Sequence, residues 1–400
     1  MGLPLAERLA TPAARTSIYY TTLYMTQAVS NPFLAIWLAG KGIGAEQIGV
    51  VNALPIFLMI VVNLVVGRLA DKASDWRSVI IAGSVFAAVV PIFLFWLDGY
   101  VAILVIWALV IIPFQAISPV VDAATYRMAR RSGIDFGAMR VWGTLGFIAM
   151  TVVAGLCLGG MGAAAFVPLL VAASIIRAVA AFGLPLLRGG EEERAARSSL
   201  APLNPLVATR LRHVWRPWFF LPLLGAALLH GSHMMQMGFG ALVWQEQGLS
   251  GATIGMLWAV APAGEVLTMF FFERISRRFA ARHLILLACL CGAVRWWGFG
   301  LQPDVWGLVL LQVLHMGSFG LAYVGIVNFI ANWTSEDMAA EAQSFFSVLR
   351  QVVTVLALTG FGYLTAHAGA SAFYVASVLA VLGILLTVVS LWLKSPRHEH

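Results

Sequence analysis

The chain has 400 residues, of which 60% are hydrophobic and only 11% are charged. A soluble globular domain carries about 25% charged residues, so this composition excludes an ordinary soluble fold and indicates a protein whose main solvent is lipid. The net charge of +7 would also suit nucleic-acid binding. The basic residues gather between apolar stretches, however, and we expect no nucleic-acid partner.

Twelve apolar stretches follow one another along the chain, and each is long enough, at about 20 residues, to cross a ~30 Å hydrocarbon core. We predict membrane-spanning helices over residues 17–39, 46–69, 78–97, 100–126, 138–159, 163–186, 217–244, 252–272, 283–301, 305–331, 341–364 and 369–393. The first stretch is longer than the apolar region of a signal peptide and no small-residue cleavage pattern follows it, so we expect an uncleaved first helix.

The basic residues indicate the orientation. With the N-terminus inside, almost all of the 25 Lys and Arg residues fall in inner segments, and Lys41 alone lies in an outer loop. Positive charge is enriched in the cytoplasmic loops of membrane proteins. We therefore predict a multi-pass protein of the inner, cytoplasmic membrane with both termini in the cytoplasm.

An internal repeat relates the two halves of the chain. The segment Gly42–Val50 resembles Gly248–Met256, and at the same offset Phe33 corresponds to Phe239. The offset spans six predicted helices, an even number, so the two halves have parallel topology.

The repeat predicts the domain organisation. We expect a six-helix bundle over 1–187, a cytoplasmic linker over 188–216, and a second six-helix bundle with a short cytoplasmic tail over 217–400. The fold class is then an all-α membrane protein with twelve transmembrane helices in two pseudo-symmetric bundles.

The segment Gly67-Arg68-Leu69-Ala70-Asp71-Lys72 resembles the opening of the loop signature of the major facilitator superfamily. This resemblance implies the major facilitator fold and a gating loop that contains Gly67, Asp71 and Lys72. The later glycine and paired basic residues of the signature are replaced here by Ala73-Ser74-Asp75-Trp76-Arg77.

Ionisable side chains lie inside the predicted helices, where each costs about 2.5–3.5 kcal/mol and needs a partner, a water-filled cavity or a function. They are Asp122, Arg140, Arg177, Glu265, Arg295 and Arg350, together with His230, His233 and His315. A carboxyl group in apolar surroundings can hold a proton near neutral pH, so we favour proton transfer as the role of Glu265 and Asp122. For Arg177 and Arg350, a buried contact that fixes helix packing is an equal alternative.

Polar residues three, four or seven positions apart share one face of a helix. Such stripes run through the first, fourth, seventh, tenth and eleventh predicted helices, where aromatic residues interrupt them. Polar faces contributed by both halves predict a water-filled substrate cavity.

Five segments narrow the resemblance to the 3-phenylpropionate permease family, a group of proton symporters. They are Pro119–Ala123, Met139–Gly143, Ala263–Val266, Gly292–Trp296 and Leu311–His315. The family is distantly similar to the lactose permease, which carries counterparts of Asp122, Arg140, Glu265, Arg295 and His315. The lactose permease has a carboxylate one turn after its histidine, whereas this chain has Ser318 and Phe319, which makes Glu265 our first choice of proton acceptor.

We predict a secondary active transporter that imports a small organic anion, an aromatic carboxylate, with protons by alternating access, in which Arg140 or Arg295 binds the carboxylate in bidentate fashion. The predicted proton-coupling residues are Glu265, Asp122 and His315. The predicted substrate-binding residues are Arg140, Arg295, Asn31, Tyr24, Gln115, Phe147, His233, Gln312 and Arg350.

Other functions remain open at this stage. The chain could carry sugars or nucleosides with protons, could export its solute, or could be a membrane receptor that transports nothing. We do not expect an enzyme, a cofactor or a bound metal, because no catalytic set or metal-ligand spacing is present. The expected partners are protons, a small-molecule solute and the lipid bilayer, and a monomer is the default.

Overall fold

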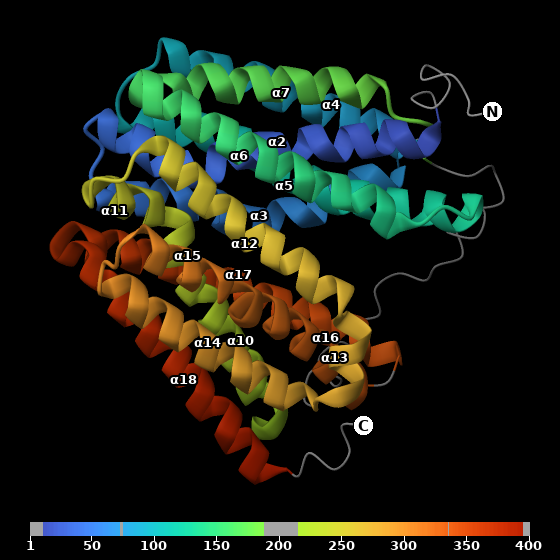
Figure 1. Cartoon of the computed structure of the whole chain (residues 1–400). Helices are drawn as coiled ribbons and strands as arrows, with labels where there is room; N and C mark the ends of the chain where they lie inside the picture. Colours follow the sequence, from blue (N-terminus) through green and yellow to red (C-terminus); the bar gives the residue numbers. More distant parts are fainter. Residues whose placement is uncertain (1–10, 73–74, 188–214, 335, 395–400) are drawn as a thin grey trace, which may run out of the picture. The chain divides into compact units, whose positions relative to one another are not determined.

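The computed structural model describes residues 11–72, 75–187, 215–334 and 336–394 (Figure 1). These residues form α-helices, short 3₁₀- and π-helical segments and turns, and no β-strand occurs among them. The described residues divide into two compact units. One takes in 11–43, 54–187 and 250–259, and the other takes in 44–53, 215–249 and 260–394.

The first unit is built from the N-terminal helices. Its elements are α2 (Pro12–Gly40), α4 (Trp76–Val89), η1 (Val90–Phe95), α5 (Tyr100–Ser132), α6 (Phe136–Met161), η2 (Gly162–Ala165) and α7 (Phe166–Phe182). Two further helices, α3 (Ala45–Lys72) and α12 (Gly251–Phe270), contribute residues to both units. In the first unit α2 packs against α6 and α7, and α4 packs against α5 and α7.

Local sequence explains where these helices begin and how closely they pack. The Asp75 and Asp135 side chains accept hydrogen bonds from backbone N–H groups at the starts of α4 and α6, which satisfies donors that the helices leave free. Helices α2 and α6 approach closely at Gly146, where a Cβ atom would lie 2.6 Å from the carbonyl oxygen of Thr21. A larger residue would push the two helices apart.

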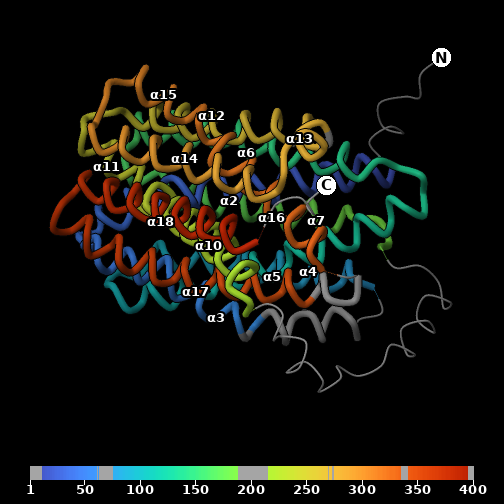
Figure 2. Tube along the Cα trace, turned by 90° about the horizontal axis from the view of Figure 1, so that it is seen from below, coloured from blue at the N-terminus to red at the C-terminus, as the bar shows by residue number. Residues whose placement is uncertain are grey.

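The second unit contains the C-terminal helices. Its elements are α10 (Pro217–Met235), η3 (Gln236–Gly240), α11 (Ala241–Glu246), α13 (Phe272–Arg278), α14 (Ala281–Gly300), α15 (Val305–Val313), η4 (Met316–Leu321), α16 (Ala322–Trp333), α17 (Glu336–Ala368), η5 (Gly369–Ser371) and α18 (Ala372–Leu393). Helix α18 lies beside α10 and α14, as the trace also shows (Figure 2). The α10–α18 crossing is tight because Gly225 meets Gly383 there.

Six helical stretches in the described residues are long and apolar enough to cross a membrane. They are Trp76–Phe95, Tyr100–Ser132, Phe136–Phe182, Ala281–Gly300, Val305–Trp333 and Glu341–Leu393. Two of these stretches, of 47 and 53 residues, each hold two α-helices joined by a short 3₁₀ turn. The predicted all-helical membrane protein is confirmed at this level, whereas the twelve-helix count stays a prediction.

Several predicted elements need correction in detail. The predicted single helices over 217–244 and 305–331 each contain a π-helical segment, η3 and η4. The end of the predicted helix over 78–97 is a 3₁₀ segment, η1. Helix α3 continues to Lys72, so part of the predicted gating loop is helical backbone. The side chains of Gly67, Asp71 and Lys72, and most of the predicted linker over 188–216, lie outside the described residues.

Candidate functional site

Two π-helical segments shape the polar interior of the second unit. Segment η3 begins at Gln236, three residues after His233, and segment η4 begins directly after His315. A π-helical turn widens a helix and shifts the direction of the side chains around it, and such turns are frequent at functional sites. Here they lie in the two helical stretches that carry the site histidines.

Arg295 on α14 is completely buried, and its N–H groups are directed at protein acceptors. Its Nε donates to the carbonyl oxygen of Leu311 at 2.9 Å, and its Nη2 donates to the Oε1 atoms of Gln236 and Gln312 at 2.5 Å. Its Nη1 donates to Nδ1 of His315 at 2.9 Å. The protein itself therefore supplies acceptors for both edges of this guanidinium group.

His315 joins Arg295 to Glu265 of α12. Because its Nδ1 accepts from Arg295, the imidazole proton must lie on Nε2, and that N–H donates to Oε1 of Glu265 at 2.7 Å. The Glu265 side chain is 35% exposed, whereas the His315 side chain is 13% exposed. We call Arg295, His315 and Glu265 the charged chain of the second unit.

His233 of α10 lies beside this chain. Its Nδ1 donates to the carbonyl oxygen of Leu229 at 2.8 Å, which leaves Nε2 to accept from the Ser318 hydroxyl at 3.1 Å. The His233 ring meets His315 edge-on, with centroids 5.5 Å apart. These contacts fix the position of His233 without any charge on its ring.

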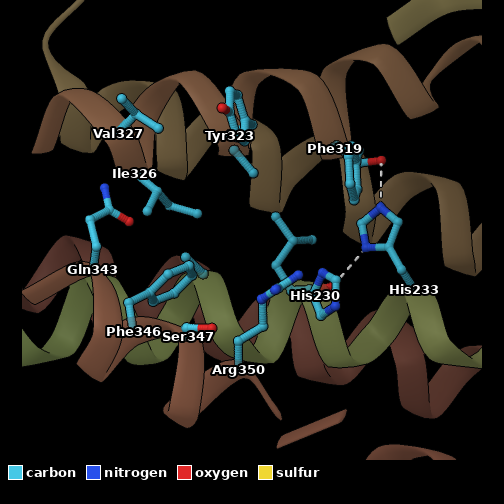
Figure 3. Close-up of a pocket in the computed structure, with 14 residues that line it drawn as sticks. His230, His233, Phe319, Tyr323, Ile326, Val327, Gln343, Phe346, Ser347 and Arg350 are labelled. Atoms are coloured by element: carbon cyan, nitrogen blue, oxygen red, sulfur yellow. Dashed lines mark hydrogen bonds between the residues drawn. The ribbon is translucent and has the colours of Figure 1, made fainter. Parts of the chain in front are cut away.

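A cavity of about 260 Å³ opens next to these residues (Figure 3). Residues of α10, η4, α16 and α17 line it. The polar lining residues are His230, His233, Ser318, Tyr323, Gln343, Ser347 and Arg350. Phe319 lines the cavity and also stacks on His315, with centroids 5.1 Å apart and planes inclined by 13°. Phe319 thus belongs to the cavity wall and also contacts the charged chain.

The first unit contains a second polar group. The Tyr20 hydroxyl donates to Oδ1 of Asp122 at 2.7 Å, and Nε of Arg140 lies 3.7 Å from the same oxygen. The Arg140 guanidinium also donates to the Tyr24 hydroxyl and lies over the Tyr20 and Tyr24 rings, 5.5 and 4.3 Å from their centroids. Arg140 and Asp122 are only half-buried.

The two polar groups bring together most of the residues that the sequence selects. Glu265, His315, Arg295, Gln312 and His233 are joined in the second unit, and Asp122, Arg140 and Tyr24 are joined in the first. Asn31, Gln115 and Phe147 are half-buried residues of α2, α5 and α6. No hydrogen bond described for their side chains connects them to Asp122 or Arg140.

Three residues of these groups are not among the site residues predicted from the sequence. Gln236 binds Arg295, Tyr20 binds Asp122, and Ser318 binds His233. Each is a polar residue in an apolar stretch, three or four positions from a selected residue on the same chain segment. That spacing could have identified them, but only the fold shows their partners.

An all-helical chain with membrane-length apolar helices, buried polar groups and an internal cavity has the features of a membrane solute carrier. The chain belongs to the MFS_1 like family, whose model matches residues 14–355. It is 26% identical over 383 residues to a probable 3-phenylpropionic acid transporter of Escherichia coli (strain K12), covering 92% of this chain and 95% of that protein. The predicted resemblance to this family is confirmed.

Other relatives carry different solutes. The chain is 24% identical over 384 residues to a maltose permease of Geobacillus stearothermophilus, covering 94% of this chain and 95% of that protein. A crystal structure of the nucleoside transporter NupG matches its fold with a TM-score of 0.78 at 14% identity, covering 96% of this chain and 98% of that chain. The protein is thus a major facilitator transporter and not an enzyme.

Proposed function

We propose that the protein is a proton-coupled symporter that imports a small organic anion by alternating access. Its chain would cross the inner membrane twelve times in two six-helix bundles, with both termini in the cytoplasm. The observation that carries the proposal is the charged chain, in which the partly exposed carboxyl group of Glu265 is connected through one imidazole to a fully buried arginine.

The hydrogen bonds of His315 make the arrangement of the charged chain of Arg295, His315 and Glu265 depend on whether a proton is bound. Arg295 requires an acceptor at Nδ1, so the Nε2–H group donates to Glu265, and this hydrogen bond is stronger when Glu265 is a carboxylate than when it is protonated. If Glu265 takes up a proton, it loses its negative charge, and its hydrogen bond to His315 and its attraction to Arg295 weaken. If His315 takes up the proton instead, its new Nδ1–H group opposes the N–H of Arg295. Either protonation rearranges the hydrogen bonds of the charged chain.

This rearrangement can be coupled to solute binding because Phe319 contacts both the charged chain and the cavity. Its ring stacks on His315 and forms part of the cavity wall. A solute that fills the cavity limits the movement of this ring, and a proton on Glu265 or His315 changes what the ring packs against. Neutralising Glu265 also removes the cost of carrying a buried charge through the occluded state.

The experiment measures uptake of radiolabelled 3-phenylpropionate into proteoliposomes with an imposed pH gradient. Glu265→Gln keeps the size of the side chain but cannot take up the proton, so we expect at least a tenfold loss of gradient-driven accumulation. Exchange of labelled for unlabelled solute without a gradient should persist. Glu246→Gln, at an exposed residue of α11, is the matched control and should accumulate solute like the wild type.

Accumulation by Glu265→Gln at the wild-type level would contradict this mechanism. A sugar or nucleoside carrier is the second candidate, because the hydroxyl, amide and imidazole groups of Tyr323, Ser347, Gln343 and His230 in the cavity could bind solute hydroxyls. Gradient-driven uptake of maltose or uridine, with none of 3-phenylpropionate, would favour that candidate over the organic anion.

A further inference from the structure

Arg350 of α17 is half-buried and differs from the buried arginines of the second unit. Arg295 donates to four protein acceptors, and Arg282 donates to the backbone and hydroxyl oxygens of Ser390. The Arg350 guanidinium has no hydrogen bond or ion pair among the described residues, and it lines the cavity. A cation in an apolar helix that is not paired by the protein is available to pair with a ligand.

The surroundings of Arg350 select an anion. None of the residues that line the cavity is acidic, so its walls offer Arg350 no carboxylate. His230 of α10 projects into the same space, and its side chain ends next to that of Arg350 (Figure 3). Ser347 lies one turn before Arg350 and adds a hydroxyl donor to the same wall. Cation, imidazole and hydroxyl form a set of donors suited to a carboxylate.

The remaining walls select the body of the ligand. Phe319, Tyr323 and Phe346 surround the cavity, and Leu229 and Ile326 complete its apolar side. A volume of about 260 Å³ is at the lower end of the ~300–1,000 Å³ that ligand pockets occupy. Polar groups of Gln343, Ser318 and His233 also line the cavity, so the walls fit a small solute that has both an apolar or aromatic body and a polar group.

We propose that Arg350 is the residue that pairs, in this cavity, with the carboxylate of the anion that the protein carries. The inference rests on the proposed function in that it assigns the anion-binding residue of the same carrier. It assigns the role of carboxylate binder to Arg350 in place of Arg295, whose donors the protein already uses, and of Arg140, which faces Asp122.

Equilibrium binding to the purified full chain tests this assignment, because binding requires no proton gradient. The probes are 3-phenylpropionate and its uncharged amide, 3-phenylpropionamide, which has almost the same shape. We expect the wild type to bind the acid at least tenfold more tightly than the amide, which corresponds to about 1.4 kcal/mol. Arg350→Gln should lose this preference, because it should bind the acid more weakly and the amide as well as the wild type does. Arg350→Lys should retain part of the preference.

Unchanged amide binding by Arg350→Gln shows that the variant is folded. Arg278→Gln, at an exposed residue of α13, is the matched control and should keep the full preference for the acid. Equal binding of acid and amide by the wild type, binding of neither, or an acid preference that survives in Arg350→Gln overturns the proposal. If Arg350→Gln binds neither probe, an acid preference in Arg350→Lys that is smaller than in the wild type supports the assignment, and full retention of the preference overturns it.

The outcome is independent of proton coupling. If the acid preference depends on Arg350 while gradient-driven uptake is absent, the carboxylate site stands and the symport mechanism fails. If uptake is driven by the gradient but the acid preference does not depend on Arg350, the symport mechanism stands and the carboxylate site is elsewhere.

Discussion

Arginine is used in two ways within the second unit. Arg295 is surrounded by two amides, a carbonyl and an imidazole that satisfy its donors, which makes its charge a fixed part of the structure. Arg350 is the cation of the cavity and has no described acceptor from the protein. A fixed cation can orient a proton-carrying group, and an available cation can bind a solute.

His315 is the residue on which the charged chain depends most. Replacement by alanine leaves Arg295 and Glu265 without their shared partner, and an unsatisfied buried charged group costs at least about 1–3 kcal/mol. We expect His315→Ala to reduce gradient-driven uptake at least tenfold. A glutamine has one acceptor and one donor at its end, so His315→Gln should retain more uptake than His315→Ala.

Initial rates of uptake in proteoliposomes, normalised to the amount of inserted protein, measure this difference. Equal uptake by both variants would show that gradient-driven uptake does not depend on the acceptor and donor groups of His315.

At the scale of the elements, segment η4 places Phe319 between the cavity and His315. We expect Phe319→Ala to weaken coupling more than exchange, because the alanine cannot transmit a movement of His315 to the cavity. Gradient-driven accumulation should fall several-fold while exchange without a gradient changes less. Phe270→Ala, at a residue that is 80% exposed, is the control, and a proportional loss of both activities in Phe319→Ala would rule out this role.

The α10–α18 crossing supports the site by fixing α10, which carries His230 and His233. A Cβ atom at Gly225 would lie 2.9 Å from the carbonyl oxygen of Gly383 and 3.2 Å from Oγ1 of Thr387. Gly225→Ala should therefore destabilise the protein by about 1–3 kcal/mol, because overpacking forces the helix backbones apart.

The thermal unfolding midpoint of the detergent-solubilised protein checks this prediction. Gly360→Ala is the matched control on α17, because its new Cβ atom would meet nothing within 4 Å. Alanine favours a helix over glycine by about 0.5–1 kcal/mol, so the control should keep or slightly raise the midpoint. A Gly225→Ala midpoint equal to that of the control would show that the crossing tolerates a larger residue.

At the scale of the whole molecule, the proposed topology places Lys41 outside and Arg278 inside. Lys41→Cys should react with a membrane-impermeant maleimide in intact spheroplasts, whereas Arg278→Cys should react only after the membrane is permeabilised. The natural residues Cys157, Cys289 and Cys291 are replaced by alanine in both variants. Labelling of both positions from the same side would contradict the proposed orientation and the twelve-span count on which it depends.

Arginines at the predicted cytoplasmic side also have structural partners. Arg15, Arg77 and Arg131 donate to carbonyl oxygens of Gly183, Phe182 and Leu187 at and beyond the end of α7. Cations near a helix C-terminus satisfy its free carbonyl groups and interact favourably with the helix dipole. Charge bias in the sequence predicts on which side these arginines lie, but it does not predict these contacts.

The sequence by itself determined that this is a helical membrane protein of a transporter family. Apolar length and the positions of charge are local properties, and they can be interpreted without knowing any partner. The costs of burying Glu265, Arg295 and His315 likewise identified these residues as important, because a charge or imidazole in an apolar helix requires an explanation wherever its partner lies.

The tertiary structure alone decided how those residues are used. The partners of Arg295 come from η3, α15 and the residue preceding η4, and which donors they satisfy depends on how these segments pack. The two π-helical segments have no signal in apolar periodicity, because they keep the same residues in an apolar stretch and change only their direction. Arg295 and Arg350 are both arginines within apolar helices, and only packing decides that Arg295 is used by protein acceptors while Arg350 has no described acceptor.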